Sequence, residues 1–351
     1  MVAAIIQEIH LRRQSTDKEI AIISNDEIIE TIYFGGGTPS LLHISQIEMI
    51  LRTIREQYHV SPDTEITLEA NPDDTDLLQL RQWRNAGINR LSIGIQSFRE
   101  IDLKWMNRAH NEEQARQCIV LAREAGFVNF SIDLIFGIPG LGNEDWQKNV
   151  QTVIDLNIPH VASYALTVEP KTALKKMITM KQKEDVNQDE QAAQYGILMQ
   201  MMQEAGYEHY EISNFAKPGY RSRHNSSYWQ QKKYIGLGPS AHSYNGESRM
   251  WNKSNNVFYC RSIVQNIIPF EKEELTPAGQ LNEYIMTSLR TIEGMDLSFI
   301  EQHFSKKERD RIEHILFDIS LKGRFNRIND HIILNNEGRL MADAISVKLF
   351  V

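Results

Sequence analysis

Cysteine is scarce in this chain, whose 351 residues include only Cys118 and Cys260. The two lie far apart and neither belongs to a short-spaced thiol motif, so the sequence implies no disulfide framework. Cys118 shares a predicted helical face with apolar neighbours (Ala115, Ile119 and Ala122), which favours a buried structural thiol over a metal ligand. Cys260 follows two aromatic residues, and we interpret it in the same way.

Long apolar runs and an excess of basic charge are also lacking. The chain has 38 Lys and Arg against 46 Asp and Glu residues, a net charge of −8, with neither sign gathered into a long block. This balance argues against non-specific binding to nucleic acid or acidic membranes. No apolar run reaches the roughly 18 residues of a membrane span, and residues 1–14 are too polar for a signal peptide. We therefore expect a cytoplasmic protein.

A first strand is the next missing feature. A helix is predicted almost from Met1, with Val2, Ile5 and Ile9 on its apolar face and Glu8 on its polar face. No capping residue precedes this helix, and no strand precedes it for its apolar face to cover. The sequence therefore predicts that a strand belongs before residue 1.

Strands and amphipathic helices then alternate through the first 206 residues. Three of the helices end at a glycine, a residue suited to the left-handed position that closes a helix. This alternation predicts an α/β fold with a parallel sheet, open or curled into a barrel, whose site lies at the carboxyl ends of the strands. The predicted strands are Thr31–Phe34, Glu65–Glu69, Arg90–Ile95, Asn129–Phe136 and His160–Thr167.

Two further regions follow this predicted barrel. Residues 207–270 are irregular and aromatic, and their length and composition hint at function. Residues 271–351 contain two or three helices and an alternating run, Phe325–Leu334, that leads to a turn at residues 335–338. This pattern predicts a small α+β module resembling a winged helix. Because its first helix is preceded by acidic residues, we expect a packing role and not DNA binding.

Four consecutive predicted strands carry polar groups near one end of the sheet. Gly35–Gly37 follow the first, where bare backbone can approach a ligand, although a structural tight turn is an equal alternative. Glu69 ends the second, where it could also simply cap a helix, and Gln96 ends the third. Asp133 lies in an apolar fourth strand, where burial would be costly without a dedicated partner. Together these residues predict one binding site.

The sequence here resembles the coproporphyrinogen III oxidase-like family of radical S-adenosylmethionine proteins. Gly35–Pro39 match its GGGTP signature, and the segments 68–72, 89–98, 132–140 and 164–166 follow in the family's order and spacing. The resemblance covers essentially the whole chain and implies a partial (β/α)6 barrel, lacking its first strand here. It also implies that S-adenosylmethionine is bound by the matching positions, which are Gly36, Gly37, Thr38, Glu69, Gln96, Arg108, Asp133 and Ala165.

One motif is similar to the HemW-like haem-chaperone branch of this family. His224, Asn225, Tyr228 and Trp229 form its HNxxYW element. An imidazole can ligate haem iron while aromatic faces cover the macrocycle, so the resemblance implies haem contacts by His224, Tyr228 and Trp229, with His224 on the iron. A lone histidine is more often structural, and His242 could simply hydrogen-bond within its glycine-rich loop.

The sequence departs from the family at one motif. Members hold a 4Fe-4S cluster with three thiolates in CxxxCxxC, whereas neither cysteine of this chain matches a cluster position. An incomplete N-terminus is favoured over natural loss of the site. Without a self-bound cluster we expect no reductive cleavage of S-adenosylmethionine and only weak binding of that cofactor.

Three functions remain to be compared. The first is a haem chaperone that passes haem to an acceptor protein, possibly one of the respiratory machinery, through which it would associate peripherally with a membrane. The second is an oxygen-independent coproporphyrinogen III oxidase, a radical enzyme of porphyrin biosynthesis. The third is a barrel remnant that takes up no haem. The sequence leaves open the acceptor, covalent haem attachment and oligomeric state.

Overall fold

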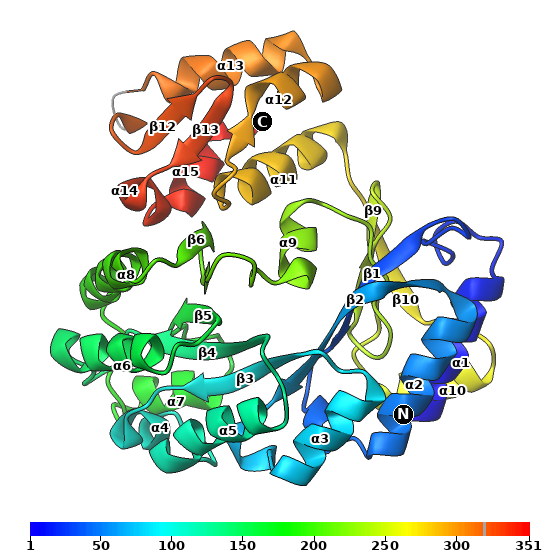
Figure 1. The fold of residues 1–351 in the computed structure, drawn as a ribbon. Helices are drawn as coiled ribbons and strands as arrows, with labels where there is room; N and C mark the ends of the chain where they lie inside the picture. The colour runs from blue at the N-terminus through cyan, green and yellow to red at the C-terminus, as the bar shows by residue number, and fades with distance from the viewer. Residues whose placement is uncertain (319–320) are drawn as a thin grey trace.

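The strands of the barrel form where β-branched and aromatic residues alternate with polar ones. The computed structural model describes residues 1–318 and 321–351, in which five parallel strands curl into part of a barrel (Figure 1). The predicted fold class is confirmed, with the strand bounds shifted by a few residues. The strands are β1 (Ile28–Phe34), β2 (His59–Ala70), β3 (Arg90–Gln96), β4 (Phe130–Phe136) and β5 (His160–Ala165).

Two antiparallel strands extend this sheet beyond β5. They are β6 (Glu208–Glu211) and β7 (Asn214–Ala216), and the sheet order is β1-β2-β3-β4-β5-β7-β6. Residues 208–216, which the sequence suggested to be irregular, therefore continue the barrel wall. Their pattern was hard to recognise because each strand is only three or four residues long.

Helices cover the convex face of the sheet (Figure 1). Alternate strand residues, such as Leu68, Ile93 and Ile132, are fully buried there against helical side chains that include Trp83 and Trp146. Cys118 is buried in this core, as predicted. The helices are α1 (Val2–Gln14), α2 (Ile44–Gln57), α3 (Leu77–Ala86), α4 (Glu100–Trp105), α5 (Glu112–Glu124), α6 (Asn143–Asp155), α7 (Ala173–Thr179) and α8 (Gln188–Glu204), with short 3-10 turns η1 (Pro39–Leu41) and η2 (Pro72–Asp74).

Helix α1 corrects one sequence expectation. Glu8, placed on the polar face by its spacing, is fully buried and pairs with the buried Arg12 (2.8 Å). Its carboxylate also accepts hydrogen bonds from Asn252 Nδ2 (2.8 Å) and Tyr259 Oη (2.6 Å). The prediction failed because these partners are distant in sequence and supply the polar contacts that solvent would otherwise provide.

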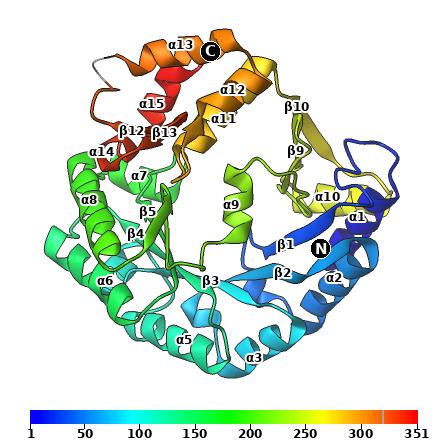
Figure 2. The same ribbon diagram turned by 45° about the horizontal axis from the view of Figure 1, so that its top comes forward.

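Residues 217–274 form the connection from the barrel to the last module. The helix α9 (Arg223–Trp229) lies inside the curl of the sheet, as Figure 2 shows. It is followed by a separate sheet of β8 (His242–Tyr244), β9 (Ser248–Asn252) and β10 (Phe270–Glu274), with α10 (Asn256–Val264) between the last two. Cys260 on α10 is only partly buried, whereas the sequence favoured a buried thiol.

The C-terminal module has its own apolar core, which includes Ile285, Leu297 and Ile345. It combines helices with a three-stranded antiparallel sheet, and the winged-helix-like arrangement stays a prediction. The expected turn at residues 335–338 is instead mainly a short helix, because Asn335 caps it by accepting from Gly338 N (3.0 Å). The elements are α11 (Pro277–Leu289), β11 (Met295–Asp296), α12 (Leu297–His303), α13 (Lys306–Leu316), β12 (Phe325–Ile328), β13 (His331–Leu334), α14 (Asn336–Arg339) and α15 (Ala342–Leu349).

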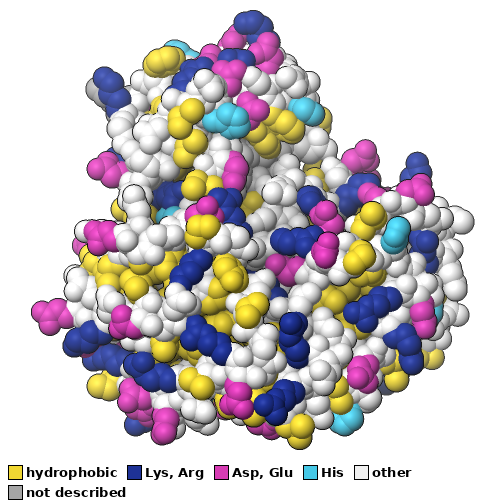
Figure 3. All heavy atoms as spheres, viewed as in Figure 1, with side chains coloured by type: hydrophobic (Ala, Val, Ile, Leu, Met, Phe, Trp, Pro, Cys, Tyr) yellow, Lys and Arg dark blue, Asp and Glu magenta, His cyan; other side chains and the backbone are white. Residues whose placement is uncertain are grey.

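The surface carries both signs of charge. On the face shown in Figure 3, acidic and basic side chains are interspersed over the barrel and the C-terminal module. Among the described residues, no helix is both long enough and apolar enough to cross a membrane.

Candidate functional site

The concave face of the barrel sheet is polar, in contrast to its convex face. It borders a cavity of about 260 Å³ that lies between the strands and α9. Because side chains on a strand alternate between the two faces, the polar residues of five strands converge on this space. The lining residues are Tyr33, Arg90, Ser92, Ser131, Asp133, His160, Ala162, Tyr164, Asn214, Ser222, His224, Asn225 and Tyr228.

Glu69 organises the loop at the carboxyl end of β1. Its carboxylate accepts hydrogen bonds from Tyr33 Oη (2.8 Å) and from the backbone nitrogen of Gly36 (3.2 Å). Gly36 and Gly37 have positive φ angles of 73° and 120°, and no heavy atom lies within 4 Å of where a Cβ would project. The loop is thus open to a ligand, with a carboxylate beside it. The exposed Thr38 begins the following turn η1.

A second polar group lies at the end of β3. Gln96 has a positive φ of 66°, an unusual conformation for a residue with a side chain. A Cβ on Gly94 would lie 2.8 Å from Gln96 Nε2, so glycine makes room for that amide. Arg108 donates to Asn71 Oδ1 (2.8 Å), and its buried Nε has no hydrogen-bond partner among the described residues. The same Cβ would lie 3.4 Å from Arg108 Nη2, so Gln96 and Arg108 both lie beside Gly94.

Asp133 does not have the dedicated partner that the sequence led us to expect. No hydrogen bond or ion pair joins its carboxylate to another described residue, although it lines the cavity. Burial and the nearby charge of Glu69 raise its pKa to about 7, while Arg90 and Arg108 act in the opposite direction. The cost of burying this unpaired acid is reduced because it faces a cavity and can be protonated near neutral pH.

Helix α9 places His224 against the barrel wall. The carboxylate of Glu65, on β2, accepts from the backbone nitrogens of Arg223 (3.1 Å) and His224 (2.9 Å), which are otherwise unsatisfied at a helix start. His224 Nδ1 lies 2.8 Å from Thr31 Oγ1, and its ring stacks on Tyr33 with centroids 4.7 Å apart. Burial lowers the pKa of His224 to about 4, so the imidazole is neutral at pH 7.

The other residues of the predicted haem set are arranged differently. Tyr228 lines the cavity and meets His224 edge-on, with centroids 5.1 Å apart. Trp229 does not line it; its ring instead lies under the guanidinium of Arg290, 6.0 Å away. His242 is exposed, beside Trp251 on β9. Ala165 is exposed at the end of β5, and no side-chain contact joins it to the groups described above.

The sequence did not single out Arg90 and His160, which line the cavity, or Tyr210, which lies behind His160. Arg90 and His160 are each 2% exposed, and Tyr210 Oη bridges His160 Nε2 (2.8 Å) and Asn225 Nδ2 (3.2 Å). Arg90 lies 3.9 Å from Glu65, measured between Nε and Oε2. A usable signal existed for Arg90 and His160, because each begins a strand whose polar residues alternate with apolar ones. Tyr210 gave no such signal.

The described residues offer no site for an iron–sulfur cluster. Cys118 Sγ lies 3.2 Å from the carbonyl of Ala115 in the core, and Cys260 lies elsewhere on α10. No group of three or more His, Cys, Asp or Glu side chains in this described part is placed to hold a metal ion.

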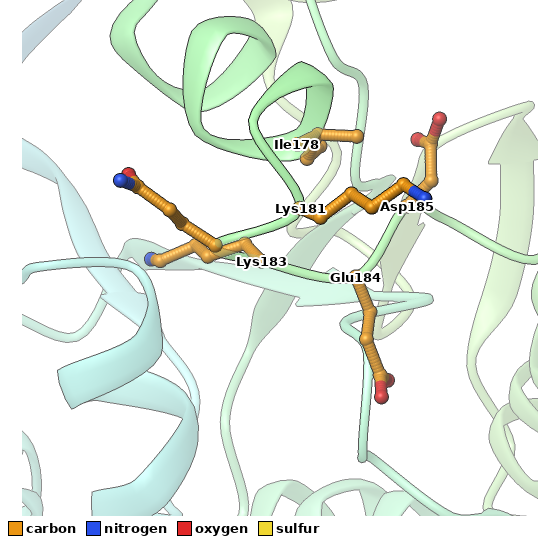
Figure 4. A pocket seen from close by; sticks show the side chains of 6 residues that line it. Ile178, Lys181, Lys183, Glu184 and Asp185 are labelled. Atoms are coloured by element: carbon orange, nitrogen blue, oxygen red, sulfur yellow. The ribbon is translucent and has the colours of Figure 1, made fainter.

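A second hollow, of about 530 Å³, shares no lining residue with the barrel cavity. It is lined by Ile178, near the end of α7, and by residues 181–185, which follow that helix. Figure 4 shows its charged side chains pointing in different directions, without a common focus. The barrel cavity is therefore the better candidate site.

Comparison with known proteins places the chain in a family. The model of the Radical SAM superfamily matches residues 6–153. The haem chaperone HemW of Bacillus subtilis is 32% identical over 319 residues, covering 90% of this chain and 84% of that protein. The chain belongs to the HemW family. HemW of Escherichia coli is 37% identical over 64% of this chain and 58% of its own length.

A solved structure supports the fold of this HemW family member. The coproporphyrinogen III oxidase HemN of Escherichia coli, described as a radical SAM enzyme, superposes with a TM-score of 0.79. The match covers 99% of this chain and 82% of HemN at 23% sequence identity. At that identity the likeness concerns the fold, and the sequence relatives carry the family assignment.

Proposed function

We propose that this chain is a haem chaperone that binds haem at the barrel and passes it to an acceptor protein. The relatives that it matches over most of its length bear that name. The observation that carries the proposal is the position of α9, whose His224 and Tyr228 face the barrel cavity. An exposed structural helix would not need an imidazole and a phenol ring at such a cavity.

His224 is the proposed ligand of haem iron. Its Nδ1 is engaged with Thr31, whereas no hydrogen bond involves its Nε2 among the described residues. Metal-bound histidines typically use one ring nitrogen for the metal and fix the ring through the other. The low pKa keeps the imidazole neutral, which is the form that binds iron. Tyr33, stacked on the ring, holds its orientation.

We propose that S-adenosylmethionine binds at the rim of the same barrel. The open Gly36–Thr38 loop and the Glu69 carboxylate suit a cationic amine with free hydrogen-bond capacity. The proposed contacts are completed by Gln96 and Ala165, which end β3 and β5, by Asp133 within β4, and by Arg108, which follows α4. When bound with a cluster, the cofactor would supply radical chemistry, but these residues do no more than bind and orient it.

Loading with haem requires the cavity to open. At about 260 Å³ the cavity is smaller than the roughly 300–1,000 Å³ typical of pockets for drug-sized ligands, and haem is large among these. Iron can reach His224 only if α9 and the barrel wall move apart. We propose this separation as the loading step, and a membrane-associated respiratory protein as the acceptor to which haem then passes.

The test is a haem titration of the full chain followed by its Soret absorption. We expect wild type to bind haem, His224→Ala to lose the shifted Soret band, and His242→Ala, which alters an exposed histidine on β8, to behave as wild type. An unchanged spectrum for His224→Ala would refute the ligand assignment. Failure of wild type to take up haem would refute the chaperone function and favour a barrel remnant.

The alternative function, oxygen-independent coproporphyrinogen III oxidase, has the likeness of fold to HemN in its favour. It requires a cluster that the described residues do not hold. We expect no decarboxylation of coproporphyrinogen under anaerobic, reducing conditions, measured by the vinyl products. Turnover in that assay would favour the enzyme over the chaperone.

A further inference from the structure

Arg90 lines the barrel cavity and leaves part of its hydrogen-bonding capacity unused. Its side chain is 2% exposed, and neither Nε nor one terminal nitrogen, Nη2, has a hydrogen-bond partner among the described residues. The neighbouring acid, Glu65, is 3.9 Å away, and both of its carboxylate oxygens accept hydrogen bonds from backbone nitrogens of α9. A buried guanidinium with unpaired donors is costly even beside an acid, so a ligand that accepted hydrogen bonds from these nitrogens would be stabilised.

The surroundings of Arg90 complete a small anion site. His160, also 2% exposed, has a free Nδ1, and its other nitrogen is engaged with Tyr210 Oη. Ser131 and Ser92, whose hydroxyls are 3.0 Å apart, lie on the same wall of the cavity. The Nε and Nη2 donors of an arginine form a planar fork that matches the two oxygens of a carboxylate.

The charges that face Arg90 restrict the kind of anion. Glu65 lies 3.9 Å away, Asp133 adds a second carboxyl group to the cavity lining, and burial lowers the pKa of His160 well below its usual value, so that this imidazole is neutral. A single negative charge fits this balance better than a doubly charged phosphate. Because the pKa of Asp133 is already near 7, that group can take a proton when an anion enters.

The cavity has an opening of suitable chemistry. Tyr164 and Tyr228 both line it, yet they are 47% and 43% exposed, so the cavity lining reaches the surface at two aromatic residues. Its volume of about 260 Å³ accepts a short acidic arm while the aromatic rings remain available to a flat macrocycle. The ligand expected here therefore combines a planar apolar body with a carboxylate on a short chain.

We propose that Arg90 binds a propionate carboxylate of the tetrapyrrole cargo. This inference rests on the proposed function, which supplies a cargo that has a flat ring and acidic arms. Arg90 thereby orients haem relative to His224 as α9 opens, and it discriminates against tetrapyrroles without free acids. Neutral esters would leave the guanidinium unpaired in the bound state.

Haem and its dimethyl ester, titrated against the full chain, test the proposal without altering the protein. We expect wild type to bind the ester about tenfold or more weakly than haem, as loss of hydrogen bonds to a charged group predicts. Arg90→Lys keeps the charge opposite Glu65 but loses the fork. It should weaken haem binding and leave ester binding unchanged. Arg81→Lys, at an exposed ion pair on α3, is the matched control and should behave as wild type.

Two outcomes overturn the carboxylate assignment: equal affinity of wild type for haem and ester, or wild-type haem affinity in Arg90→Lys. S-adenosylmethionine also has a carboxylate, so its affinity is measured in parallel. If Arg90→Lys weakens only S-adenosylmethionine, the site serves that cofactor and the assignment is wrong.

Failure of the proposed function would give a different result, namely no haem binding by wild type. The carboxylate site is then tested with sodium propionate alone, by line broadening of its carbon-13 signal. Broadening by wild type and not by Arg90→Lys supports a carboxylate site. No broadening by wild type refutes it.

Discussion

The carboxyl group of Asp133 gives the barrel cavity a pH dependence of known sign. Its folded-state pKa is about 7, against an ordinary value of 3.8, so the folded protein holds a proton that the unfolded chain releases in between. Stability from this group is therefore present at acidic pH and is lost as pH rises from about 4 to 7, with a maximal slope of about 1.4 kcal/mol per pH unit.

Asp133→Asn should remove that slope. We expect the difference in free energy of unfolding between the variant and wild type to grow in favour of the variant from about pH 5 to about pH 7. Urea denaturation at both pH values measures it. A pH-independent difference would show that Asp133 titrates normally in the folded state.

Glu8 presents the opposite situation, a buried acid whose acceptors are all used. Its oxygens accept from Arg12 Nε (2.9 Å), Asn252 Nδ2, Tyr259 Oη and Gly238 N (2.9 Å). Removing one partner of a buried ion pair leaves the other charge uncompensated. Glu8→Ala should therefore lower the free energy of unfolding by about 3–5 kcal/mol, measured by urea denaturation.

The matched control for Glu8→Ala is Glu124→Ala, which breaks an ion pair with Arg81 in which both side chains are more than half exposed. Exposed pairs contribute about 0–1 kcal/mol, so this variant should stay close to wild type. Similar losses in the two variants would mean that the Glu8 cluster does not hold α1 to the connecting region.

At the scale of the element, α9 is held in the barrel by the carboxylate of Glu65. Glu65→Gln keeps one acceptor oxygen but weakens its bonds to the backbone nitrogens of Arg223 and His224. Loss of a helix cap costs about 0.5–2 kcal/mol, so amide exchange in residues 223–224 should accelerate about 2- to 30-fold. Hydrogen exchange with mass spectrometry measures this change.

The same variant tests whether opening of α9 limits haem loading. If it does, Glu65→Gln should take up haem faster in stopped-flow absorption. The control, Asp76→Asn, weakens an equivalent cap at the start of α3, where Asp76 accepts from Gln79 N (2.7 Å). Faster exchange at α9 without faster haem uptake would contradict the proposed loading step.

The sequence predicted the barrel strands well because apolar and polar residues alternate along each strand and turn-forming residues flank it. The same alternation predicted that Glu69, Gln96 and Asp133 lie on neighbouring strands. It could not place α9, because a helix of seven residues inside a barrel depends on contacts with β1 and β2, which are 193 and 159 residues away in the chain. Glu65 and Arg90 lacked an obvious role for the same reason.

At the scale of the whole molecule, α9 also connects the barrel to the C-terminal module. Backbone hydrogen bonds join Ile212 N to Arg290 O (3.1 Å) and Ile292 N to Tyr210 O (3.0 Å), so the barrel edge and the end of α11 share a short ladder. The Arg290 guanidinium lies over Trp229, the last residue of α9. We therefore expect a movement of α9 to change the contacts between the barrel and the C-terminal module.

Arg290→Ala should weaken this coupling. Loss of a cation over an indole ring costs about 0.5–2 kcal/mol, and here the cost falls on the junction between two separate apolar cores. We expect calorimetric unfolding to broaden or divide into two transitions. Asp343→Ala removes the ion pair that Arg290 makes within the module, where Asp343 is 78% exposed, and should leave a single transition. If both variants unfolded in the same way, the stabilisation would come from that ion pair. The contact between Arg290 and Trp229 would then not couple α9 to the module.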